Sequence, residues 1–283
     1  MGRLAKALYP KDNLQALSLL KLCVIGVGRR LARNSGAMGV EIICLVKILS
    51  DSENPYREIS VSLKDVKKYA TKSENSNYNL HQFDLPFRSL VIAPSGRGKR
   101  NFICNLISLF CKGKVGTFDK IHIFCKCRDE PLFYRFLTDK SKGLIEIHEN
   151  LDTLPPINEL KPTEQTLLIF DAFITDIKKH PIISEYFIRG RKRNCSINFL
   201  SQFYYGTPKI IRQNVSYLVV LKLGGSRDVS SFLRECSVDL TKEELLHMYN
   251  DATREKFNCF IINRDKSGND KYRHNFLEYY HID

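Results

Sequence analysis

Short apolar runs alternate with amphipathic segments along most of the chain. The β-branched, apolar runs predict strands over residues 89–93, 120–125, 144–148, 166–170, 196–200, 217–222 and 258–262. The segments between them predict helices over residues 99–111, 131–138, 181–189, 208–213, 226–235 and 240–250. Strands that alternate with helices form βαβ units. The pattern therefore predicts an α/β fold with a mainly parallel sheet and helices on both faces.

Residues 1–79 differ in composition from the rest of the chain. Their start is basic and leucine-rich, and residues 71–79 are polar, as is typical of a linker. We expect an N-terminal extension with a linker over residues 1–79 and one domain over residues 80–283. The apolar stretch at residues 14–28 contains Lys21 and is shorter than the roughly 20 residues that cross a bilayer, so no membrane partner is expected.

Charge and cysteine usage narrow the class of protein. The formal net charge of +13 and the pI near 9.3 favour an anionic partner such as nucleic acid, because neutralising phosphates releases counterions. Nine cysteines are present, and no second close Cys/His pair accompanies Cys125 and Cys127. This spacing predicts reduced, mostly buried thiols of an intracellular protein and no zinc site.

A phosphate-binding loop is predicted directly after the first strand. Residues 89–105 have the sequence SLVIAPSGRGKRNFICN, in which an apolar strand, a glycine-containing loop, a lysine and a helix follow one another. Glycines allow backbone N–H groups to turn toward phosphates, and the lysine ammonium binds the β- and γ-phosphates. The predicted nucleotide-binding residues are Pro94, Ser95, Gly96, Arg97, Gly98, Lys99 and Arg100.

Two loop positions depart from the GxxxxGK[ST] pattern. Ala93 replaces the first glycine, a change that ordinary backbone angles tolerate. Arg100 replaces the Ser/Thr whose hydroxyl binds Mg²⁺, and a guanidinium repels a cation at close range. On the loop alone, an ordinary glycine-containing turn before a helix is the competing interpretation.

The strand over residues 166–170 is followed by an acid that suits a magnesium site. The segment TLLIFDAFITD places Asp171 at the strand end, as expected of the carboxylate that holds Mg²⁺ beside a phosphate loop. The next position, where many such ATPases carry a general base, is Ala172. Asp176 is the nearest replacement, but it lies too far along the chain for positioned catalysis. Hydrolysis is therefore in doubt at two positions.

Gln202 and an arginine cluster complete the set of candidate residues. Gln202 follows the strand over residues 196–200, where it is placed to sense a γ-phosphate and orient water. The run RGRKRN just before that strand supplies Arg191, which we assign either to a neighbour's nucleotide in a ring or to DNA phosphates. A solvated basic surface is the competing interpretation of the run.

These motifs, in this order, resemble the poxvirus-type DNA-packaging ATPases of the FtsK/HerA P-loop superfamily, including Maverick/Polinton-like transposon members. The resemblance rests on SLVIAPSGRGK, LLIFDAFITD, RGRKRN, FLSQ and TPKIIRQNVSYLVVLKL, and covers roughly residues 83–276. It implies a RecA-like core, a homo-oligomeric ring, commonly a hexamer, and ATP-driven translocation of double-stranded DNA. Capsid or portal-like partners and a location in the host nucleus or at the viral assembly site follow from it.

Carried over by motif, Ser95, Gly96, Gly98 and Lys99 bind phosphate, with ATP and Mg²⁺ as cofactors. The resemblance further implies that Asp171 binds Mg²⁺, that Gln202 acts as sensor and that Arg191 is the family's arginine before this strand.

The departures from the family fall at Arg100 and Ala172. Two hypotheses follow: a packaging ATPase of the family, either active or recently inactivated, or an inactive DNA-binding or assembly subunit derived from one. A nucleotide kinase is the third P-loop alternative, and the sequence has no arginine-rich lid to support it.

Overall fold

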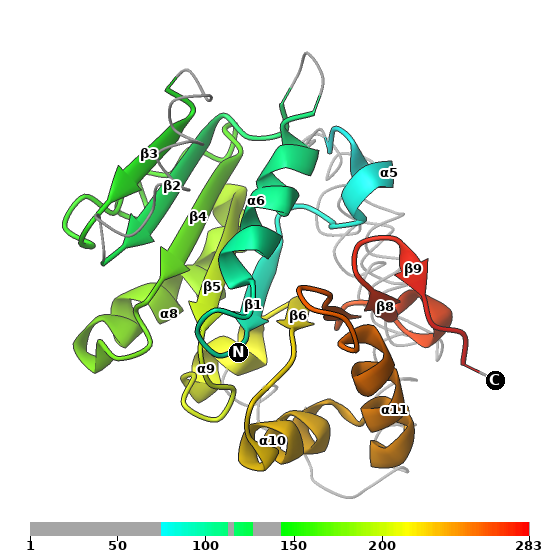
Figure 1. Ribbon diagram of the computed structural model, residues 1–283. Coiled ribbons are helices and arrows are strands. Elements are labelled where there is room, and N and C mark those ends of the chain that lie inside the picture. Colours follow the sequence, from blue (N-terminus) through cyan, green and yellow to red (C-terminus); the bar gives the residue numbers. More distant parts are fainter. Residues whose placement is uncertain (1–74, 113–115, 127–142, 283) are drawn as a thin grey trace, which may run out of the picture. The chain divides into compact units, whose positions relative to one another are not determined.

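The computed structural model describes residues 75–112, 116–126 and 143–282 (Figure 1). The chain separates into two compact units, Met1–Ala70 and Thr71–Asp283, and the described residues all belong to the second. The predicted helix over residues 131–138 and nearly all of the predicted N-terminal extension lie outside them. The domain boundary at residue 79 stays a prediction.

The described unit is built on one sheet with the strand order β3-β2-β4-β5-β1-β6-β7-β8-β9. All pairs from β3 to β6 are parallel, and the pairs from β6 to β9 are antiparallel. The strand bounds are β1 Arg88–Ile92, β2 Lys120–Cys125, β3 Ile145–His148, β4 Thr166–Asp171, β5 Cys195–Ser201, β6 Tyr217–Val220, β7 Phe260–Asn263, β8 Tyr272–His274 and β9 Glu278–Tyr279. This confirms the predicted α/β fold with a mainly parallel sheet.

Helices cover both faces of the sheet, as predicted (Figure 1). On one face α6 packs through apolar side chains at helical spacing, including Phe102, Leu106 and Phe110. The other face carries Phe187 of α8 and Phe232 of α10 in a separate core. The helix bounds are α5 Tyr78–His81, α6 Lys99–Phe110, α8 His180–Arg189, α9 Lys209–Asn214, α10 Ser226–Cys236 and α11 Lys242–Ala252, with 3-10 turns at η2 Ile177–Lys179, η3 Gly190–Arg193 and η4 Gly268–Asp270.

Helix α11 begins two residues later than predicted because of its cap. The Thr241 hydroxyl accepts from the Glu244 N–H, and the Glu244 carboxylate accepts from the Thr241 N–H in return. This capping box fixes the start of the helix at Lys242.

Strands β8 and β9 were not predicted, since β8 contains a charged residue. Arg273 is 1% exposed, and its guanidinium lies over the rings of Phe83, Tyr217 and Tyr279. It also donates to the carbonyl of Phe276 over 3.0 Å. Strand β8 pairs with β7 and β9 and buries this cation among aromatic faces, an arrangement that apolar alternation does not predict.

Part of the segment predicted as a linker contacts the domain. Asn77 Nδ2 donates to the carbonyl of Lys112 over 2.8 Å, and Asn75 Nδ2 donates to that of Phe83 over 2.8 Å. The six described cysteines are free thiols, and all but Cys111 are buried, as the sequence predicted.

Candidate functional site

The loop between β1 and α6 has the backbone that phosphate binding requires. Gly96 and Gly98 have φ of 73° and 99°, a region that side chains with a Cβ rarely adopt. Gly98 is also the N-cap of α6 and makes no side-chain cap bond. The first N–H groups of α6 are thus not satisfied by a side chain of the cap, and the positive end of the helix dipole lies at the loop.

Lys99 is held at the base of this loop. Its Nζ donates to the carbonyls of Ala93 over 2.5 Å and of Pro94 over 3.1 Å. Burial lowers the pKa of Lys99, and the Asp171 carboxylate acts in the opposite direction. A phosphate oxygen would compete with the two carbonyls for this ammonium.

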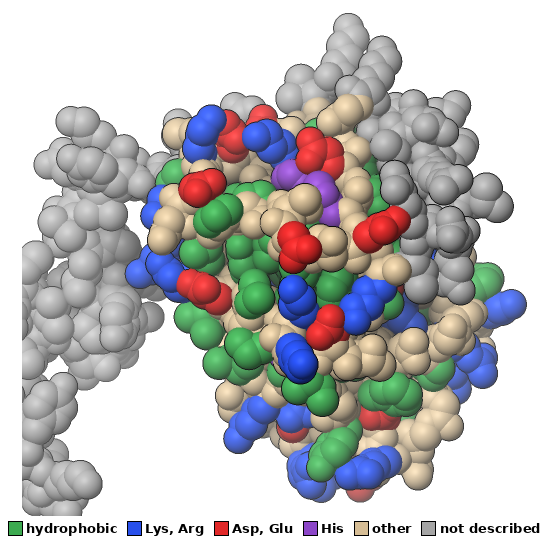
Figure 2. All heavy atoms as spheres, turned by 90° about the vertical axis from the view of Figure 1, so that its left-hand side faces the viewer, with side chains coloured by type: hydrophobic (Ala, Val, Ile, Leu, Met, Phe, Trp, Pro, Cys, Tyr) green, Lys and Arg blue, Asp and Glu red, His purple; other side chains and the backbone are tan. Residues whose placement is uncertain are grey.

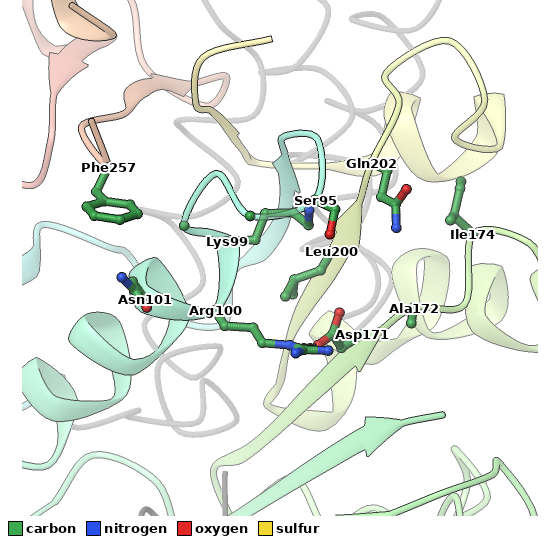
Figure 3. Close-up of a pocket in the computed structure, with 12 residues that line it drawn as sticks. Ser95, Lys99, Arg100, Asn101, Asp171, Ala172, Ile174, Leu200, Gln202 and Phe257 are labelled. Carbon is green, nitrogen blue, oxygen red and sulfur yellow. Dashed lines mark hydrogen bonds and ion pairs between the residues drawn. The ribbon is translucent and has the colours of Figure 1, made fainter. Parts of the chain in front are cut away.

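Arg100 reaches across the site to the acid at the end of β4. Its Nε donates to Asp171 Oδ2 over 2.7 Å, while the Asp171 side chain is 6% exposed and the Arg100 side chain 32% (Figure 3). A charge-assisted bond to a buried carboxylate is among the stronger polar contacts in proteins. The residue predicted to repel Mg²⁺ therefore occupies the carboxylate predicted to bind it.

A cavity of about 540 Å³ lies between the loop that follows β1, the carboxyl ends of β4 and β5, and Phe257 (Figure 3). This volume suits a nucleotide-sized ligand. Its lining comprises Ser95, Gly96, Gly98, Lys99, Arg100, Asn101, Asp171, Ala172, Ile174, Leu200, Gln202 and Phe257. Five predicted loop residues thus meet Asp171 and Gln202 at the carboxyl ends of β1, β4 and β5. Pro94 and Arg97 belong to the loop and do not line the cavity.

The side chains present fit a phosphate group better than a magnesium ion. The loop offers backbone N–H groups, Lys99 and a helix N-terminus, which together bind anions. Position 100 supplies no hydroxyl, and the carboxylate of Asp171 already accepts from a guanidinium. Mg²⁺ requires oxygen ligands in near-octahedral geometry. The described lining offers one carboxylate for such an ion, Asp171, which Arg100 already contacts, so water and nucleotide phosphates would have to supply the other ligands.

The position after Asp171 adopts an unusual backbone. Ala172 has φ of 64°, in the left-handed region where short polar residues and glycine are better tolerated than alanine. Asp176 does not line the cavity; its Oδ2 lies 3.0 Å from Lys126 Nζ, and this lysine lowers the pKa of Asp176. The structure therefore gives Asp176 another partner and no place as a substitute base.

Gln202 and Arg191 lie at opposite ends of strand β5. Gln202 directly follows β5 and lines the cavity together with Ser95 and Ile174 (Figure 3). Arg191 belongs to η3, which precedes β5, and lies near Arg88 at the start of β1. Within one chain Arg191 is therefore remote from the cavity, and its catalytic assignment stays a prediction that requires a second subunit.

Phe257 is a cavity residue that the sequence pattern did not predict. It has φ of 74° and is 47% exposed. A Cβ added at Gly98 would meet Phe257 Cδ1 at 2.6 Å, so the ring lies directly against the phosphate loop. A bulky residue at positive φ is unusual and is concentrated at functional sites. The only sequence signal is a lone aromatic in the polar run REKFN, which does not predict a contact with residue 98.

No helix among the described residues is long and apolar enough to cross a membrane.

Comparison with known proteins gives one matching family and several similar proteins. The family described as "Poxvirus A32 protein" matches residues 72–273. The DNA packaging protein OPG160 of Variola virus is 25% identical over 173 residues, which is 59% of this chain and 64% of that protein. The protein of the same name from Monkeypox virus is also 25% identical, over 57% of its length. The match thus spans less than two thirds of these relatives.

A solved structure shares the fold. The genome packaging NTPase B204 from Sulfolobus turreted icosahedral virus 2, in complex with sulfate, superimposes with a TM-score of 0.51 at 13% identity. The superposition covers 68% of this chain and 97% of that one. At this identity the likeness concerns the fold alone, and it agrees with the predicted P-loop architecture.

Proposed function

Because the chain belongs to the poxvirus A32 protein family, we propose that it acts in packaging double-stranded DNA into a viral or virus-like capsid. In this proposal residues 94–100 bind the phosphates of ATP, and Mg²⁺-dependent hydrolysis is impaired. The relatives named as DNA packaging proteins support the first part. The proposed place of action is the viral assembly site.

One observation carries the proposal about hydrolysis: the ion pair between Arg100 and Asp171. Phosphoryl transfer depends on a metal that bridges the β- and γ-phosphates and neutralises developing charge. Here a fixed guanidinium lies beside the carboxylate that would hold that metal. Arg100 thereby supplies positive charge next to bound phosphates, while the absence of an acid at Ala172 removes the group that would activate water.

A basic hollow supports DNA as the partner. Arg227 and Arg234 of α10 and Lys242 of α11 line a cavity of about 460 Å³ with Tyr205. The Arg227 guanidinium lies 4.1 Å from the centre of the Tyr205 ring. Clustered cations with an exposed aromatic residue suit a sugar-phosphate backbone, which such translocases grip without regard to sequence.

The position of Arg191 favours a homo-oligomeric ring. Arg191, Lys192 and Arg193 form a basic turn at the amino-terminal end of β5, away from the chain's own cavity. In a head-to-tail ring, such as a hexamer, this turn would face the neighbouring subunit's nucleotide. A capsid or portal-like protein would then receive the DNA that the ring handles.

The decisive experiment is ATP hydrolysis by the purified chain with and without double-stranded DNA. We expect slow turnover for the wild type and a clear gain in the double variant Arg100→Thr/Ala172→Asp, which restores a hydroxyl and an acid. Adding Lys99→Ala to the double variant controls for contaminating ATPases, because it removes the phosphate-binding ammonium. Wild-type turnover as fast as that of the double variant would contradict the proposed impairment.

The second candidate function is an inactive DNA-binding or assembly subunit, and the Arg100–Asp171 pair favours it as well. The two candidates differ in the wild type. Absence of turnover together with intact DNA binding would favour the inactive subunit. No gain of hydrolysis in a folded double variant would contradict the roles given to Arg100 and Ala172.

A further inference from the structure

Three potential metal-binding side chains converge on one face of β2 and β3. Parallel pairing places His122 of β2 opposite Glu146 of β3, and Phe124 opposite His148. Side chains two residues apart on a strand share a face, so His122, Glu146 and His148 all project from the same side of the sheet. None of the three lines the cavity at the phosphate loop.

The ligand atoms of the three side chains form a small triangle. Nδ1 of His122 lies 3.1 Å from Nε2 of His148 and 3.3 Å from Oε2 of Glu146, and the last two atoms are 3.7 Å apart. Bonds of about 2.0–2.1 Å at tetrahedral angles place zinc ligands about 3.3–3.4 Å from one another. The observed triangle therefore already has the size of a zinc coordination face.

A second contact orients one of the ligands. Thr153 Oγ1 lies 2.8 Å from Nδ1 of His148. A proton on Nδ1 donated to this hydroxyl leaves the lone pair of Nε2 directed at His122 and Glu146. Metal-binding histidines generally have such a partner on the other ring nitrogen. The Phe124 ring, stacked on His148 at 4.8 Å between centroids, further restricts the imidazole.

The cluster is buried on one side and open to solvent on the other. His122 is 7% exposed, whereas the Glu146 side chain is 57% exposed, which leaves a path for an ion from solvent. On the face that carries the β3 edge, histidine side chains reach the surface beside acidic ones (Figure 2). Lys120, on the same strand as His122, is a nearby cation that would repel a metal ion. Its Nζ lies 3.7 Å from Oε2 of Glu164, which partly neutralises its charge.

Against the expectation of no zinc site that the cysteine spacing gave, we propose that His122, Glu146 and His148 form a binding site for a divalent transition-metal ion of the zinc class. Two imidazoles and one carboxylate are a recognised ligand set for zinc, and three protein ligands leave one coordination position open. The ion would join β3, an end strand of the described sheet, to β2. The site is separate from the nucleotide cavity, and its presence does not depend on ATP hydrolysis.

The test is Zn²⁺ binding to the full chain by competition with a chromophoric chelator. We expect binding of about one equivalent and at least tenfold weaker binding in Glu146→Gln, with a similar loss in His148→Gln. Because the Glu146 side chain is mostly exposed, Glu146→Gln should fold normally, and its thermal transition in chelator should match the wild type. His247→Gln, an exposed histidine on α11, is the matched control and should keep full affinity.

Two further measurements distinguish this site from other zinc-binding groups. Thr153→Val should weaken Zn²⁺ binding by about tenfold, as loss of such an outer partner does. Co²⁺ in place of Zn²⁺ should give visible bands without the near-ultraviolet thiolate band of cysteine ligation. Full Zn²⁺ affinity in Glu146→Gln, or a Co²⁺–thiolate band, would overturn the proposal and leave only a hydrogen-bonded cluster at β2 and β3.

Discussion

The Nε of Arg100 donates to Oδ2 of Asp171 over 2.7 Å, and this ion pair joins the first turn of α6 to the end of β4. The arginine that stands at residue 100 in place of the usual Ser or Thr thus changes two features of the site. It removes the hydroxyl expected to bind Mg²⁺, and it places a cation on the only other protein ligand predicted for that ion.

Arg100→Thr should make nucleotide binding depend on Mg²⁺. In the wild type we expect similar affinities for ATP with and without Mg²⁺, because the guanidinium supplies the charge. In the variant, released Asp171 and the new hydroxyl should make Mg²⁺ improve ATP affinity by about tenfold or more. Titration of a fluorescent ATP analogue with Mg²⁺ or chelator measures this.

Arg97→Thr is the matched control, since it removes the same charge from the same loop without contact to Asp171. An equal Mg²⁺ response in Arg97→Thr and Arg100→Thr would mean that net loop charge, rather than the ion pair, sets the metal dependence.

Ala172 should tolerate short polar residues better than β-branched ones. At φ of 64°, Ala172→Asn and Ala172→Asp should stay within about 1 kcal/mol of the wild-type free energy of unfolding, because these residues accept left-handed backbone. Ala172→Val should cost about 1–3 kcal/mol at the same position. Urea denaturation compares the three variants. A valine variant as stable as the asparagine variant would show that this backbone carries no strain.

Phe257→Ala should weaken ATP binding through the base rather than the phosphates. The ring lies against the loop at Gly98 and is exposed enough to stack on a nucleobase. Loss of base–aromatic stacking costs about 1–3 kcal/mol, which is about a 5- to 150-fold change in affinity. Binding of inorganic triphosphate should be unchanged. Phe203→Ala, a similarly exposed aromatic outside this cavity, serves as control, and equal loss for ATP and triphosphate would contradict the stacking role.

The basic hollow at α10 and α11 should account for part of the salt dependence of DNA binding. Replacing Arg227, Arg234 and Lys242 together by glutamine should make the slope of log affinity against log salt less negative by about 2–3. This is close to one per lost phosphate contact. Fluorescence anisotropy with a double-stranded oligonucleotide at several salt concentrations gives this slope.

The basic turn of η3 provides the contrast. Glutamine at Arg191, Lys192 and Arg193 removes the same charge from the opposite end of the sheet. If this second triple variant changes the slope and the first does not, the DNA surface lies at η3.

His81 should make the fold sensitive to acid. Burial lowers its pKa from 6.5 to about 4, and its Nδ1 accepts from the Phe83 N–H over 3.0 Å. The unfolded chain binds the His81 proton at higher pH than the folded chain does. The contribution of neutral His81 to the free energy of unfolding is therefore fully present above about pH 6.5 and is lost as the pH falls toward 4. The loss attributable to this group is about 2–3 kcal/mol.

His81→Asn tests this directly, because the Asn side-chain oxygen can accept from Phe83 N–H without titrating. Urea midpoints between pH 7 and pH 4.5 should fall less steeply in this variant than in the wild type. His247→Asn should leave the wild-type slope unchanged, and an unchanged slope in His81→Asn would exclude His81 as the source.

Local pattern was sufficient for most of the core elements. Apolar runs predicted β1 to β7 within about two residues, because a buried parallel strand needs β-branched and apolar side chains wherever it lies. The glycine loop was predictable for the same reason: positive φ at Gly96 and Gly98 is a local requirement. Strand β8 was missed because its central residue is a buried arginine whose aromatic neighbours come from distant parts of the chain.

By itself, the sequence determined the α/β class, the glycine-containing loop between β1 and α6 and the acid at the end of β4. Only the tertiary structure decided which partners these groups have. Arg100 and Asp171 are separated by 71 residues, and His122 and His148 by 26, so no local pattern relates them. The parallel arrangement of the strands brings the members of each pair together. An ion pair and a shared metal ligand set both depend on distances of a few ångströms, which spacing along the chain does not encode.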